Sequence, residues 1–329
     1  MKLRVGRRER SLTSTTTTTS FGHNVSAGSQ GKQLLVLLFF IGSFCVFSLI
    51  VPASEHFTLP EDTACMQRLL KMEEQFNRRR QNRIDAMFTL NTTKHTERFD
   101  VFEPEANCIS DERFGSDIRH LAIGDGPKFV CGVDFIGNKN AKNPKDACLV
   151  YSIGSNNHIE FEKAVHDFLG CETHTFDPTL RQAFKGGEYS TFHPWGIGAE
   201  GELYQHRRHK FVTKSLQTIV SELGHTNRII DIFKIDCEGC EYEAMPAFFD
   251  MIASKQIHVN QIQIELHLQS YDLVSKLFMA ADRAGMRIFH KERNGWGCGG
   301  HRCLEYSFVS ESFLRKVNGA LLCGETSTA

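Results

Sequence analysis

The stretch that decides the fold runs from Ala147 to Asn157 and reads ACLVYSIGSNN. Its first seven residues form a short apolar run, which is typical of a buried central strand in a parallel sheet. Gly154 then allows a tight turn in which the backbone can approach a ligand. Apolar residues recur at helical spacing immediately afterwards, at Phe161, Ala164, Val165, Phe168 and Leu169. The stretch therefore predicts a strand, a turn and a helix.

The same alternation continues along the chain. Short apolar or alternating runs predict strands at 172–176, 229–235 and 261–266, with a closing pair at 286–290 and 303–309. Helical spacing predicts helices near 216–223, 241–253 and 273–281. Strands that alternate with helices predict an α/β fold, a doubly wound, mostly parallel sheet with right-handed crossovers. Ligands in that architecture bind at the carboxyl ends of the strands.

Candidate binding residues lie where the first two of these strands end. Ser152, Gly154, Ser155 and Asn156 close the first strand, and Asp177 follows the second, twenty-three residues after Gly154. An acid at about this distance can hold a pair of ribose hydroxyls. The turn is not G-x-G-x-x-G, which disfavours a nicotinamide cofactor, and the chain contains no G-x-x-x-x-G-K-[ST] phosphate loop.

The most specific motif is FKIDCEGCE at Phe233 to Glu241. Together with the glycine turn and Asp177 it resembles the FkbM-type methyltransferase domain, whose hallmark is a strand ending in K-I-D-x-E-G-x-E. YSIGSNN, and IELH ending at His267, resemble the membrane-anchored methyltransferase-like branch of that family. The resemblance covers about residues 100 to 315. It implies a Rossmann-like, seven-stranded class I methyltransferase sheet whose last strand is antiparallel.

The resemblance also implies S-adenosylmethionine as the cofactor and O-methylation of a small molecule or glycan. By position, the cofactor-binding residues would be Ser152, Gly154, Ser155, Asn156, Asp177, Gly196, Ile197 and Asp236, with Trp195 beside the adenine. Methyl transfer to an oxygen needs a positioned proton acceptor. The candidates are Asp236, Glu238 and His267, and Asp236 is preferred. Glu238 and Glu241 could instead cap the following helix, and His267 could be a core histidine.

A second apolar segment, Leu34 to Val51, reads LLVLLFFIGSFCVFSLIV. Eighteen uncharged residues predict a transmembrane helix. Basic residues before it and acidic residues after it predict a type II membrane protein with a luminal domain, in the Golgi or endoplasmic reticulum. The predicted organisation is a disordered cytosolic tail (1–33), an anchor (34–51), a stem (52–98), the methyltransferase domain (99–316) and a C-terminal tail (317–329). Arg78, Arg79, Arg80 and Arg83 lie in the stem, and we interpret them as a solvated face rather than a lipid or polyanion contact.

The cysteines agree with a luminal domain. Ten of the eleven lie beyond the span, an even number that suggests disulfides in an oxidising compartment, and Asn91-Thr92-Thr93 is a glycosylation sequon. Cys237-x₂-Cys240 and Cys298-x₄-Cys303 raise a zinc alternative, which the spacing disfavours. We predict no metal.

Two other functions share this topology. Asp236-x-Glu238 could bind a metal ion and a nucleotide diphosphate in a type II glycosyltransferase, or the domain could be an inactive binding module. A net charge of −1 gives no basic field, so we predict no nucleic-acid partner. The sequence does not predict an oligomeric state.

Overall fold

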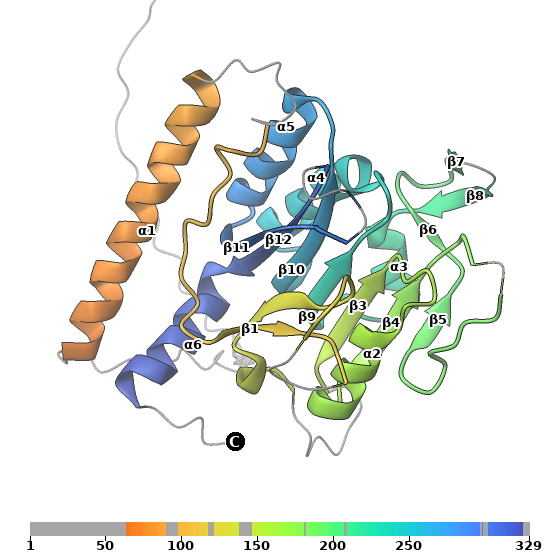
Figure 1. The fold of residues 1–329 in the computed structure, drawn as a ribbon, viewed down its shortest axis with the longest axis horizontal. Coiled ribbons are helices and arrows are strands. Elements are labelled where there is room, and N and C mark those ends of the chain that lie inside the picture. Colours follow the sequence, from red (N-terminus) through yellow and green to blue (C-terminus); the bar gives the residue numbers. More distant parts are fainter. Residues whose placement is uncertain are drawn as a thin grey trace, which may run out of the picture. The chain divides into compact units, whose positions relative to one another are not determined.

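The computed structural model describes residues 64–89, 98–117, 122–137, 147–180, 182–206, 209–296, 298 and 302–324. At its centre is a seven-stranded sheet in the order β11-β12-β10-β9-β3-β4-β5 (Figure 1). All neighbouring strands are parallel except β12, which runs antiparallel to β10 and β11. The strands are β3 (Leu149–Ile153), β4 (Glu172–Phe176), β5 (Thr191–His193), β9 (Ile229–Ile235), β10 (His258–His267), β11 (Met286–Arg293) and β12 (Cys303–Ser310). The predicted mixed seven-stranded sheet is confirmed.

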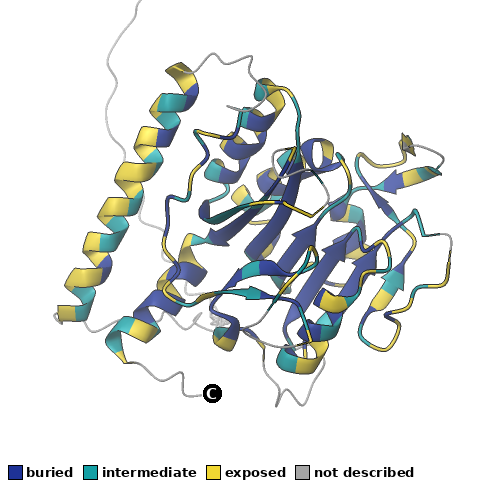
Figure 2. Ribbon diagram, viewed as in Figure 1, coloured by how far each residue is buried: buried dark blue, intermediate teal, exposed yellow. Residues whose placement is uncertain are grey.

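Both faces of the sheet are covered, and its central strands are buried (Figure 2). On one face Phe233 and Ile235 pack against α3 (Leu216–Glu222), α4 (Glu241–Ala253) and α5 (Tyr271–Arg283). On the other face Val150 and Ile232 pack against α2 (Glu160–Ala164) and α6 (Glu311–Cys323). This two-sided burial explains why the central strands are continuous apolar runs.

Local signals set the ends of the helices. Ser215, Ser270 and Ser310 each accept a hydrogen bond from the backbone N–H three residues on, which caps α3, α5 and α6. The helix predicted after β3 is α-helical only to Ala164 and continues as a π-helical turn, Val165–Leu169. Gly170 ends it in the left-handed region.

Two small sheets were not predicted. Strands β1 (Asp111–Phe114) and β2 (Lys128–Cys131) form an antiparallel pair over the α2 and α6 face, followed by a 3₁₀ turn, Val133–Phe135. Strands β6 (Gly196–Ile197), β7 (Leu203–His206) and β8 (His209–Lys214) form the other, beyond β5. Each of these strands has at most six residues, too few to show a clear period in the sequence.

The stem helix α1 (Ala64–Thr89) is attached to the domain. Arg80 pairs with Asp282 at 2.6 Å, and Arg83 pairs with Glu105 at 2.7 Å and with Asp282 at 2.9 Å. The interpretation of the arginine run as solvated is therefore wrong for Arg80 and Arg83. The sequence could not reveal this, because both acids come from segments distant along the chain.

The C-terminal helix also belongs to the packed domain. The predicted boundary at residue 316 falls inside α6, where Val317 and Asn318 are buried. Asn318 accepts from the N–H of Ile109 and donates to the carbonyl of Asn107. Residues 317–324 therefore belong to the packed domain and not to a C-terminal tail.

The ten cysteines beyond the predicted span form five disulfides: Cys65–Cys323, Cys108–Cys131, Cys148–Cys171, Cys237–Cys240 and Cys298–Cys303. The predicted disulfides are therefore present, and they include both cysteine pairs that raised the zinc alternative, Cys237–Cys240 and Cys298–Cys303. Cys45, the predicted anchor at 34–51, the N-terminal tail and the sequon at Asn91 lie outside the described residues. Among the helices that are described, none combines the length and the apolar character needed to cross a bilayer.

Candidate active site

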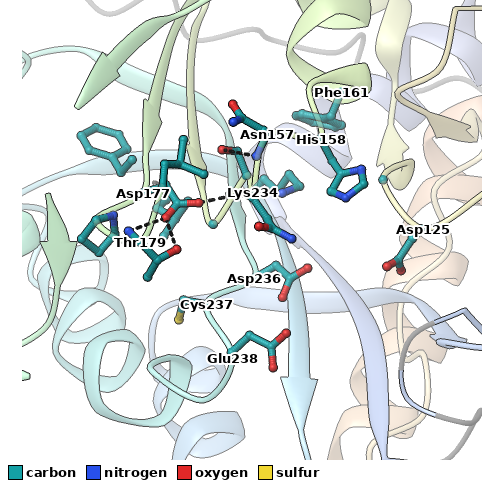
Figure 3. Close-up of a pocket in the computed structure, with 18 of the residues that line it drawn as sticks. Asp125, Asn157, His158, Phe161, Asp177, Thr179, Lys234, Asp236, Cys237 and Glu238 are labelled. Atoms are coloured by element: carbon teal, nitrogen blue, oxygen red, sulfur yellow. Dashed lines mark hydrogen bonds between the residues drawn. The ribbon is translucent and has the colours of Figure 1, made fainter. Parts of the chain in front are cut away.

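A cavity of about 880 Å³ opens at the carboxyl ends of β3, β4 and β9 (Figure 3). Its floor is formed by the turns that leave these strands, and its walls come from the loop before β2 and from the sheet of β6, β7 and β8. Predicted site residues that line it are Gly154, Ser155, Asn156, Asp177, Trp195, Gly196, Ile197, Asp236 and Glu238. The topology thus gathers nearly all of the predicted residues into one site.

Gly154 holds two of these turns together. Its φ is +77°, and a Cβ built there would lie 1.6 Å from the carbonyl oxygen of Asp236. Its N–H donates to the backbone carbonyl of Phe176, and the N–H of Asp236 donates to the backbone carbonyl of Ile153 at 3.0 Å. Any side chain at 154 would push the β3 and β9 turns apart. Gly154 is therefore needed, before any contact with a ligand, because it lets the β3 turn approach the backbone of Asp236.

Asp177 is fixed in the cavity wall by three hydrogen bonds. The Asn156 N–H donates to Oδ2 at 2.8 Å, while the N–H and hydroxyl of Thr179 donate to Oδ1 at 2.8 and 2.6 Å. The residue is 3% exposed. A carboxylate has about four acceptor positions, so Oδ2 can still accept from a ligand hydroxyl.

The part of the cavity wall that follows β5 is apolar and aromatic. Trp195, Gly196 and Ile197 line the cavity together with Phe211 of β8. A Cβ at Gly196 would lie 2.2 Å from the Phe211 ring, so the glycine allows that ring to pack there. The ammonium of Lys214 lies 3.9 Å from the centre of the Trp195 ring, a cation–π contact. This wall suits a flat aromatic group.

Beside Asp236 lies a buried acidic cluster that the sequence did not predict as a unit. Burial raises the pKa of Glu265 well above its usual range, and the nearby carboxylates of Asp236 and Glu305 raise it further. Lys128, on β2, pairs with Glu305. Asn294 donates to Glu265 at 3.0 Å. Glu265 stands in the IELH motif, whereas the hairpin residue Lys128 carried no sequence signal.

The three predicted proton acceptors are not equivalent. Asp236 is half-buried at the end of β9, and Glu238 lines the cavity with an exposed side chain and a φ of +60°. His267, at the end of β10, does not line the cavity and lies 3.6 Å from both Glu238 and Glu241. Burial lowers the pKa of His267, but the Glu241, Asp236 and Glu238 carboxylates outweigh it, so the pKa is raised overall.

Ser152 and Glu241 contribute to the structure around the cavity and do not line it. Ser152 is fully buried below the turn and donates to Glu162 at 2.5 Å, so the structure does not bring it to the cavity as predicted. Glu241 is fully buried and accepts from the N–H of Cys237 at 2.9 Å. It therefore stabilises the turn that carries Asp236 and Glu238. This is a structural role like the helix cap considered for Glu241, although the bonded N–H lies before α4.

A family model described as a methyltransferase domain matches residues 58–310 of the chain. The chain belongs to this methyltransferase-domain family. Among curated proteins, "Probable methyltransferase-like protein 24" of Rattus norvegicus is 26% identical over 206 residues, which is 55% of this chain and 53% of that protein. The chain thus matches about half the length of this curated relative.

Solved structures of other methyltransferases are similar at lower identity. The N-methyltransferase NodS of Bradyrhizobium japonicum WM9 has a TM-score of 0.31 and 9% identity, over 50% of this chain and 85% of that one. The 1,6-didemethyltoxoflavin-N1-methyltransferase of Burkholderia thailandensis, solved with S-adenosylhomocysteine, has a TM-score of 0.30 and 9% identity, over 49% and 70%.

Membership in the methyltransferase-domain family confirms the predicted enzyme class and favours it over the glycosyltransferase. The matched span of 58–310 includes the whole of α1 and ends where α6 begins. The FkbM type is finer than the family that matches, so it stays a prediction.

Proposed function

We propose that this member of the methyltransferase-domain family uses S-adenosylmethionine to methylate an oxygen of a small molecule or glycan. The single observation that carries the proposal is the meeting of Asp177 and Asp236 in one cavity, on turns that Gly154 holds in contact. The FkbM-type motif at residues 233–241 supports the O-methyl chemistry.

The residues present fit this cofactor. Asp177 has spare acceptor capacity for a ribose hydroxyl, and the wall of Trp195 and Ile197 suits an adenine ring. Asp236 and Glu238 add negative charge, which favours a cationic sulfonium. When bound, S-adenosylmethionine would supply an activated methyl group.

In the chemical step the chain contributes position and a proton acceptor. Asp236 is the preferred base, because its half-buried carboxylate lines the cavity at the end of a rigid central strand. His267 is separated from the cavity and pairs with Glu238 and Glu241, which suits a residue that orients the turn.

We also propose that the domain works in the oxidising lumen of the secretory pathway, in the Golgi or endoplasmic reticulum, held there by the segment at 34–51. Five disulfides support an oxidising compartment, because such bonds are rare in the cytosol. The apolar length of Leu34 to Val51 supports the anchor. Glycan at Asn91 and protease protection of the C-terminal domain in microsomes would test this placement.

Calorimetric titration of the purified full-length protein with S-adenosylmethionine tests the function. Binding is expected, whereas a nucleotide sugar with Mn²⁺ should give none. Transfer of a labelled methyl group to an extract of small molecules and glycans then separates an active enzyme from a binding module. The absence of cofactor binding would overturn the proposal.

A further inference from the structure

Lys234 is a buried cation that faces the cavity. It lies on β9 two residues before Asp236, is 6% exposed, and lines the cavity between the ends of the central strands (Figure 3). Within the part of the chain that the structure describes, its ammonium group has no hydrogen-bond acceptor and no carboxylate partner. The buried cavity residue Lys128, by contrast, is paired with Glu305 and also donates to the carbonyl of Asp125.

A purely structural role would require a partner inside the protein. The residues beside Lys234 in the sheet are Ser152 on β3 and Gln263 on β10. Ser152 donates to one oxygen of Glu162, while the other oxygen of Glu162 and the side-chain oxygen of Gln263 are buried without a partner. Two acceptors are thus available nearby, and Lys234 bonds to neither.

The stem of Lys234 is buried between the strand ends, whereas its ammonium group is not among the buried atoms that lack a partner and so reaches the cavity. An anion that enters the cavity would give this ammonium group a charge-assisted hydrogen bond that the described residues do not give it. Lys234 is therefore placed as a site for a negative group of a ligand.

The charges on the rest of the cavity indicate which part of a ligand this is. Five acids line it: Asp125, Glu160, Asp177, Asp236 and Glu238. Among the described lining residues the lysines other than Lys234 are Lys128, which is already paired, and Lys185, which is exposed. Most of the cavity therefore repels an anion, and the position beside Lys234 accepts one.

We propose that Lys234 binds the α-carboxylate of the methionine part of S-adenosylmethionine. The inference rests on the function proposed above, which requires this cofactor. The cofactor carries two cationic groups, a sulfonium and an ammonium, and one carboxylate. The acids other than Asp177, which is assigned to the ribose, suit the two cations, while the unpaired ammonium of Lys234 suits the carboxylate. This charge pattern would fix the direction in which the cofactor lies.

The test compares two ligands on two proteins. Decarboxylated S-adenosylmethionine keeps the sulfonium, the amine and the nucleoside, and lacks only the carboxylate. Calorimetric titrations of full-length wild type and Lys234→Met with both ligands form a closed cycle. Wild type should bind S-adenosylmethionine about 10- to 100-fold more tightly than the decarboxylated form, the range expected of a charge-assisted hydrogen bond, and Lys234→Met should lose this preference. Lys276→Met, on the exposed surface of α5, is the matched control and should keep it.

Each other result has a defined meaning. Equal affinity of wild type for both ligands overturns the inference without any variant, which covers the case in which Lys234→Met does not fold. Equal weakening of both ligands in folded Lys234→Met also overturns it, since that indicates a structural role. Unchanged binding of both ligands to Lys234→Met overturns it as well and leaves an anionic acceptor as the partner of Lys234. If wild type binds neither ligand, the proposed function itself fails.

Discussion

Replacing Arg83 by methionine should weaken the packing of the stem helix against the domain. The Arg83 guanidinium contacts both oxygens of Glu105, at 2.7 and 3.3 Å, and Asp282 at 2.9 Å. Asp282 would keep Arg80 and Arg287, whereas the buried Glu105 would lose its arginine. Removing one partner of a buried pair typically destabilises a protein by about 3–5 kcal/mol. We therefore expect Arg83→Met to lower the unfolding free energy by about that amount.

Thermal unfolding of the full-length protein, followed by near-ultraviolet circular dichroism, measures this change. For a domain of this size the loss corresponds to a fall in Tm of roughly 6–20 °C. Arg78→Met is the matched control, because Arg78 is exposed and pairs with the exposed Glu74 at 3.5 Å, so a change within about 0.5 kcal/mol is expected. Adding Glu105→Met to Arg83→Met should recover much of the loss. If Arg83→Met behaves like Arg78→Met, the buried pairs of Arg83 do not stabilise the domain.

The remaining predictions concern the cavity. Asp177→Ala should weaken S-adenosylmethionine binding by about 1.5–3 kcal/mol in calorimetry, and unchanged affinity would show that its hydrogen bonds serve only the turn. Asp236→Asn should lower turnover by about 10²–10⁴-fold while leaving cofactor affinity largely intact, and near-normal turnover would remove Asp236 as the base. The third prediction concerns pH. Burial and the neighbouring acids raise the pKa of Glu265, so the folded state keeps this proton at pH values where the unfolded chain has released it. The free energy of unfolding therefore falls as the pH rises above 4.5, the ordinary pKa of a glutamate. Glu265→Gln should flatten that decline in Tm between pH 5 and 9, and parallel curves for the two proteins would contradict the assignment.

The central fold was predictable because its signals are local. The run at 147–153 and the stripe from Phe161 to Leu169 each fix one element through residues close together in sequence, and parallel topology then brings the strand ends to one edge. Gly154, Asp177 and Asp236 were found for this reason. They meet in the cavity although they are separated by up to eighty-two positions.

What the sequence did not reveal depends on contacts between distant segments. Lys128 comes from a four-residue strand whose pattern is too short to read, and it meets Glu305 only after the hairpin folds over the sheet. Ser152 was placed in the site because it precedes the turn, but its side chain points below the turn to Glu162. The role of Arg83 was missed because a run of arginines has the same sequence whether the side chains face water or pair with acids from another part of the fold.

The Cys65–Cys323 bridge determines an order of events while the chain is being made. The two cysteines are 258 residues apart, and at a synthesis rate of about 5–20 residues per second the second follows the first by roughly 13 to 52 s. During that interval Cys65 is a thiol without its partner, while Cys108, Cys131, Cys148 and Cys171 appear beside it. The nascent chain thus passes through a period in which mispairing competes with maturation. Any truncation upstream of Cys323 would leave Cys65 permanently without its partner.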